Sequence, residues 1–140
     1  MIAEGWLLVR ASGRRVGLAL SQVIEVVDLG PVYPVPSTDA AVRGVTTSRG
    51  RLVPLVHLGS LLDAATPSGG GGTAVLVQLA GRRVCLEVDE VEEVLREPGI
   101  PVPADVSLPF AVAVARQESG LVPLLDLTAV GDRITETATS

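Results

Sequence analysis

The chain has 140 residues, of which 47% are hydrophobic, so it can form one ordinary domain or two very small ones. The formal net charge of −5 argues against nucleic acid or an anionic membrane as the main partner. Apolar runs are broken every few residues by Arg, Gly, Pro or Asp, and the start lacks a signal-peptide pattern, so we expect no membrane insertion. One cysteine excludes an internal disulfide and suits a reducing cytosol, which predicts a cytoplasmic protein.

The first predicted elements are two strands of a hairpin. Residues 6–9 are apolar, and the stretch 15–20 alternates between apolar and smaller or polar side chains, which is the period of a half-buried strand. Ser12-Gly13 supplies the turn. Ser21 is an N-cap residue type, so one helical turn is expected before a third strand at 25–29.

A second hairpin is predicted around Arg49-Gly50, between strands at 45–47 and 52–56. Residues 58–65 then read as a short helix. The segment 67–72, with four consecutive glycines, predicts a flexible linker. It is not a phosphate-binding loop, because neither the required lysine nor a helix follows it.

The second half of the chain repeats the first. Leu8-Val9 and Gly13-Arg14-Arg15-Val16 recur 68 positions later, and Leu52-Val53-Pro54-Leu55 recurs 69 positions later. Asp89, with Glu92 three residues on, predicts a capped helical turn equivalent to that at Ser21. The repeat therefore predicts two copies of one folding unit, a first barrel at residues 6–66 and a second at residues 73–130. The polar, Thr-rich segment 131–140 is predicted to be a flexible tail.

Each copy contains about five short strands with tight turns, the pattern of a small closed β-barrel. A half of about 60 residues has only a marginal core of its own. The sequence therefore predicts an all-β fold in which two five-stranded barrels share buried surface, with short helical turns.

Few residues point to catalysis. His57 is the only histidine and has no second ligand at metal spacing, so a structural role is favoured over metal binding or catalysis. A Cys85–His57 nucleophile pair would need the two side chains alongside each other, and nothing in the sequence requires that. No cofactor or metal is expected, and the pattern favours binding over enzymatic activity.

Two groups of charged residues are candidates for a binding surface. The acidic run Asp89, Glu90, Glu92, Glu93 and Glu97 is either a solvated face or a surface that faces a partner. Arg43, Arg49 and Arg51 are close in sequence around Gly44 and Gly50. Arginine is favoured at interfaces because its planar fork makes several directed hydrogen bonds.

The stretch from Gly44 to Leu58 resembles the CheW family of chemotaxis coupling proteins, which shows a Gly, an Asn, an Arg-Gly turn and an apolar strand closing in Asp-Leu. Val23-Ile24-Glu25-Val26 and the stretch 86–91 are similar to two further family motifs. The likeness runs from about Trp6 to Val130. Thr47 stands where the family usually has Asn, and His57 where it usually has Asp.

The resemblance implies two SH3-like five-stranded barrels around a common hydrophobic core, and no catalysis. It also implies an adaptor that joins the cytoplasmic tip of methyl-accepting chemoreceptors to the regulatory domain of a CheA-type histidine kinase, at membrane-associated receptor arrays. Val23, Glu25 and Arg49 match residues implicated in these contacts, and Gly50 and Arg43 complete the predicted partner-binding set. A divergent scaffold of another pathway such as surface motility, a small β-barrel enzyme and a small-ligand carrier remain alternatives.

Overall fold

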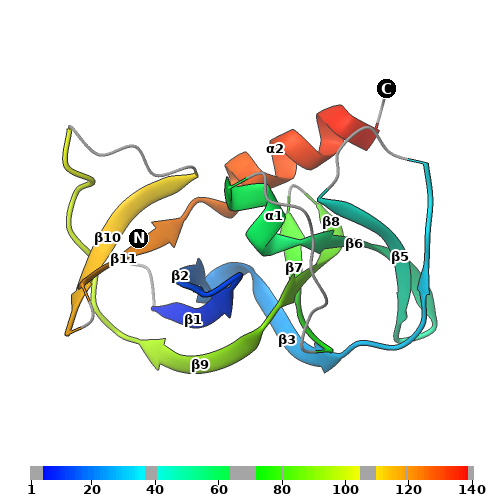
Figure 1. Cartoon of the computed structure of the whole chain (residues 1–140), viewed down its shortest axis with the longest axis horizontal. Helices are drawn as coiled ribbons and strands as arrows, with labels where there is room; N and C mark the ends of the chain where they lie inside the picture. Colours follow the sequence, from blue (N-terminus) through cyan, green and yellow to red (C-terminus); the bar gives the residue numbers. More distant parts are fainter. Residues whose placement is uncertain are drawn as a thin grey trace.

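The computed structural model describes residues 5–36, 41–63, 72–79, 81–104, 110–118 and 120–138, without the side chains of 63 and 133–138. Most of the described chain is β-strand, in two sheets (Figure 1). The strands are β1 (Trp6–Ala11), β2 (Arg14–Ala19), β3 (Val23–Asp28), β4 (Val32–Tyr33), β5 (Val42–Ser48), β6 (Arg51–His57), β7 (Thr73–Leu79), β8 (Arg82–Val88), β9 (Glu90–Leu95), β10 (Ala111–Gln117) and β11 (Gly120–Leu125). The predicted linker lies outside the described residues except for Gly72.

The two sheets exchange hairpins between the sequence copies. One sheet has the order β10-β11-β2-β1-β9, so the first hairpin of copy one (β1-β2) lies among strands of copy two. The other sheet has the order β3-β7-β8-β6-β5-β4, so the first hairpin of copy two (β7-β8) lies among strands of copy one. To stay beside its own hairpin, β3 would have to run parallel to β2 on the far side of β1. Such a crossover needs a dozen or more residues, and only the 3₁₀ turn Leu20–Gln22 connects β2 to β3. The ranges 6–66 and 73–130 therefore delimit the repeat, but neither sheet is built from one of them.

Each sheet curls back on itself through one bent segment. In the six-stranded sheet, β3 and β4 follow one another along the chain and form the two opposite edges. In the other sheet, Ile100 shortly after β9 forms an isolated bridge with Val114 of β10. Counting β3 and β4 as one bent strand, each sheet has five strands. No continuous ladder closes either sheet within the described ranges, but the predicted all-β fold with two SH3-like units is confirmed.

Within the described part of the chain, alternating side chains on the strands build three apolar clusters. The largest is shared, because it holds residues of β1 and β2 together with residues of β7 and β8. Each sheet also encloses a smaller cluster of its own. These are Trp6, Leu8, Ala115, Val122 and Leu124 in one sheet, and Val53, Leu55, Ala74, Leu76 and Cys85 in the other.

Two helices, α1 (Leu58–Asp63) and α2 (Leu127–Ala138), follow β6 and β11 at equivalent places in the repeat. The prediction of a flexible tail at 131–140 was wrong for residues up to 138, which are helical. Leu127 and Val130 are completely buried in the shared cluster, and this packing holds the helix against the sheets. No helix among the described residues is both long and apolar enough to span a membrane.

The capped helical turn predicted at Asp89 is also absent, since β9 begins at the next residue. The Asp89 carboxylate accepts a hydrogen bond from the Gly13 amide (3.1 Å) instead of capping a helix. Asp89 therefore joins the turn of the β1–β2 hairpin to the start of β9.

Candidate functional site

The turn between β5 and β6 presents Arg49 at its tip. Ser48 pairs with Arg51, which leaves Arg49-Gly50 as a two-residue loop. Such a loop needs positive φ at both positions when its twist matches the strands, and the φ values are 54° and 77°. Gly50 meets this need without strain, and the Arg49 side chain is 64% exposed. The fold thus holds a guanidinium in solvent at a fixed point.

Arg49 is bound by a carboxylate from another strand. Its Nε lies 2.6 Å from Oε2 of Glu25 on β3. The hydrogen bond from Arg49 lowers the pKa of Glu25 below the usual carboxyl value, although partial desolvation acts in the opposite direction. Two of the sequence-predicted site residues are therefore brought together as an ion pair that leaves Arg49 largely exposed.

Val23 does not share this environment. On a regular strand Val23 and Glu25 would lie on one face, but the register with β7 shifts between them at a β-bulge. Val23 packs against the shared apolar cluster, while Glu25 meets Arg49. The bulge leaves Ile24 between them 37% exposed. Sequence reasoning missed Ile24, because a bulge is set by pairing with another strand.

Exposed apolar side chains lie close to the ion pair along the chain. Val26 on β3 is 48% exposed, and Leu52, next to the hairpin tip, is 64% exposed. Exposed apolar side chains with an arginine nearby are typical of a surface that binds another protein.

Arg43 lies apart from Arg49. It is near the start of β5, whereas Arg49 follows its end, and a strand of that length spans roughly 20 Å. Arg43 Nε is 3.4 Å from Oε1 of Glu87, a buried residue on β8 whose Oε1 accepts no hydrogen bond from the described residues. The sequence grouping of Arg43 with Arg49 and Arg51 is therefore not a spatial cluster.

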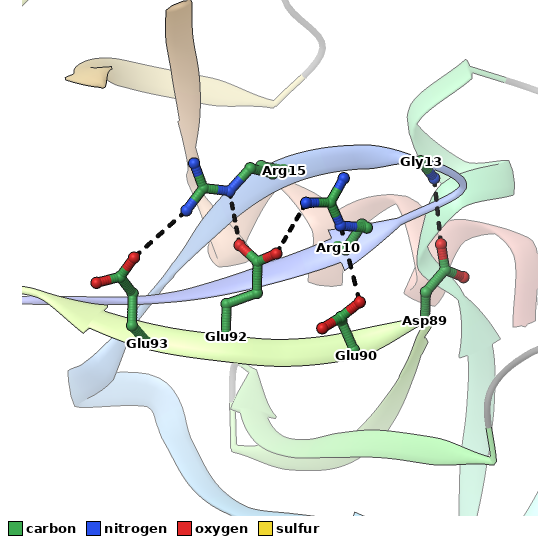
Figure 2. Close-up of polar contacts among 7 residues, drawn as sticks. All are labelled: Arg10, Gly13, Arg15, Asp89, Glu90, Glu92 and Glu93. Carbon is green, nitrogen blue, oxygen red and sulfur yellow. Dashed lines mark hydrogen bonds and ion pairs between the residues drawn. The ribbon is translucent and has the colours of Figure 1, made fainter. Parts of the chain in front are cut away.

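The acidic run of β9 is largely neutralised within the molecule (Figure 2). Glu92 accepts hydrogen bonds from Arg15 Nε at 2.6 Å and from Arg10 Nη2 at 2.9 Å. Glu90 and Glu93 are paired with the same two arginines at 3.9 and 3.4 Å. These ion pairs join the first hairpin (β1-β2) to β9 of the second copy. The acidic run of β9 therefore stabilises the exchanged strands and is a poor candidate for an acidic docking surface.

Comparison with known proteins identifies the family. The model of the CheW-like domain matches residues 5–134 of the chain. The chain belongs to this family. The scaffolding protein TtCheW from Thermoanaerobacter tengcongensis has a similar structure, with a TM-score of 0.75, 21% sequence identity, and 89% of this chain and 90% of that one covered. No curated protein matches the chain.

In this CheW-like domain the Cys85–His57 pair considered from sequence does not have the properties of a nucleophile and its base. Cys85 is fully buried inside its sheet, and burial, with a smaller effect of Glu25, raises its thiol pKa, whereas a nucleophilic cysteine needs a lowered one. His57 is buried and its Nδ1 is engaged by Ser60. The described residues contain no group of three or more His, Cys, Asp or Glu that could hold a metal.

Proposed function

We propose that the protein is a non-catalytic adaptor that couples the cytoplasmic tips of chemoreceptors to a CheA-type histidine kinase. Membership of the CheW-like family and the fold shared with a scaffolding protein support this proposal. The protein acts through contacts with the regulatory domain of the kinase and with the receptor tip. It works in the cytoplasm, at receptor arrays that are associated with the membrane.

The observation that carries the proposal is the exposed Glu25–Arg49 ion pair beside Ile24 and Leu52. An exposed ion pair contributes little to folding, so its fixed geometry is better explained by recognition. Gly50 is the residue that allows the tip its backbone conformation. Arg43 contributes indirectly, by holding the start of β5 through Glu87.

The test is the binding of purified variants to receptor-tip fragments and to the kinase regulatory domain. We expect Arg49→Ala to weaken binding roughly tenfold or more, as for an interface arginine that is truncated. Arg49→Lys recovers only part of the affinity, because the charge remains but the planar fork is lost.

Arg116→Ala, an exposed change on the other sheet, is the control, and circular dichroism checks the folding of each variant. Equal binding of Arg49→Ala and the parent to both partners would show that the site lies elsewhere. If the parent binds neither partner, the result would instead favour a CheW-like scaffold of a non-chemotactic pathway.

A further inference from the structure

Four arginines gather at one end of the six-stranded sheet, which we call the basic end: Arg49, Arg51, Arg82 and Arg83. The strands β6 and β8 are parallel neighbours, with Leu55 opposite Cys85, so their first residues lie at the same end of the sheet. Arg51 begins β6 and Arg82-Arg83 begins β8. Arg49 precedes β6 in the tight turn.

The basic end has an excess of positive charge in a molecule whose net charge is −5. All four side chains belong to exposed residues. Among the described residues, the contacts place the carboxylate of Glu25 beside these arginines. Glu25 is bound to Arg49 and is close enough to Arg83 for that charge to stabilise its ionised form. All 11 basic residues of the chain are arginines, and four of them lie here.

The equivalent end of the other sheet shows that the fold does not require this charge. There Arg15, the counterpart of Arg83, is bound by Glu92 and Glu93. The counterpart of Arg49 is Glu118, and the counterpart of Arg51 is Gly120. Two ends built on the same repeat thus differ: Arg15 is paired with two glutamates at one end, whereas its counterpart Arg83 is exposed at the other.

The basic end is not purely cationic. Leu52, between Arg51 and Val53, is 64% exposed. A polyphosphate would gain nothing from this leucine and would be repelled by Glu25 and by the net charge. An acidic protein segment can pair its carboxylates with the arginine forks and cover the leucine with an apolar side chain.

We propose that the basic end binds an acidic segment of a partner protein, with carboxylates on Arg51, Arg82 and Arg83 and an apolar side chain on Leu52. This proposal rests on the scaffold function above and deepens it, because it names the chemistry of the partner surface. Arg49, held by Glu25, fixes one border of the contact.

The test uses the full chain and a fluorescein-labelled amphipathic peptide with Glu on one face and Leu on the other. The variant Arg82→Gln/Arg83→Gln lowers the net charge by two. Arg116→Glu on β10 lowers it by the same amount far from the basic end, so it controls for net charge. We expect the double variant to bind the peptide roughly tenfold more weakly than the parent, and Arg116→Glu to bind like the parent. A peptide with Gln in place of Glu is expected to bind weakly to all three proteins.

Equal affinity of the two variants for the Glu peptide would overturn the proposal. So would tighter binding of the parent to an RNA duplex or to phosphatidylserine vesicles than to the peptide. The receptor-tip and kinase fragments separate this proposal from the adaptor function. If both fragments bind the double variant as well as the parent, the basic end is not the contact surface but the adaptor function stands. If the parent binds the peptide through the basic end but neither fragment, the adaptor function fails and the acidic-segment site stands.

Discussion

His57, which stands where the second copy has Asp126, acts as a helix cap. The Ser60 amide donates to its Nδ1 at 3.1 Å, and the Ser60 hydroxyl lies 2.8 Å from the same atom. In the second copy Asp126 accepts from the Thr128 amide at 2.9 Å. Both side chains accept a hydrogen bond from an amide in the first turn of the following helix, so the two copies use different residue types for the same cap.

We expect His57→Ala to lower the free energy of unfolding by at least about 1 kcal/mol, because the cap is lost and a cavity is left. His57→Asn retains an acceptor for the Ser60 amide and costs less. Urea unfolding followed by circular dichroism measures both. If the two variants are equally unstable, the ring acts through packing and not as a cap.

Gly59 gives a second prediction, because a Cβ there would collide with the Oγ of Ser12 and lie 2.6 Å from its Cβ. Gly59→Ala gains about 1 kcal/mol of helix propensity but loses about 1–3 kcal/mol to overpacking, so we expect net destabilisation. Ser12 has φ of 52°, which suits glycine. In the background Ser12→Gly the same alanine should become stabilising. A double-mutant cycle by urea unfolding measures this, and additive effects would refute the contact.

The attachment of β9 to the first hairpin depends on the ionisation of Glu92. The hydrogen bond from Arg15, and a weaker contribution from Arg10, lower the pKa of this carboxyl below its ordinary value of 4.5. A lowered folded-state pKa contributes stability that is complete above the ordinary value and is lost as the pH falls through the lowered one. Acid therefore weakens the attachment of β9 to the first hairpin.

We expect Glu92→Gln to cost about 1 kcal/mol at pH 7, a value that allows for the partial exposure of the pair. The difference between variant and parent should shrink as the pH is lowered below 4.5. Urea unfolding across this range measures it, with Glu118→Gln as the control for loss of an exposed carboxylate. A difference that does not depend on pH would mean that Glu92 acts through its shape alone.

Local patterns in the sequence predicted most of the elements but not their partners. The alternation at 15–20 and the Arg49-Gly50 turn gave the hairpins, since both signals are local. Strand exchange depends on the short β2–β3 connection, and the bulge at Ile24 depends on pairing with β7. Neither feature can be predicted from the residue pattern of a single strand. The helix after Asp126 could have been found by symmetry with the predicted helix at 58–65. Sequence named Glu25 and Arg49 without showing that they bind each other.

Because the two sheets exchange hairpins, each copy of the repeat lacks strands that complete the sheets. In a fragment of residues 1–66, β3 and β6 would lose β7 and β8, while β1 and β2 would lose β9 and β11. We expect this fragment to be unfolded or aggregated, and to become structured when residues 67–140 are added in equal amount. Circular dichroism and size exclusion measure both states. A fragment that unfolds cooperatively by itself would contradict the shared core.

The exchange also affects how the chain folds as it is synthesised. The first hairpin leaves the ribosome early, yet its neighbours β9 and β11 end at Leu95 and Leu125. Likewise, β3 and β6 cannot pair with β7 and β8 until these later strands are synthesised, so their apolar faces stay exposed until then. Neither sheet can therefore be completed until most of the chain has been made, and during translation the nascent chain is exposed to aggregation and open to chaperones.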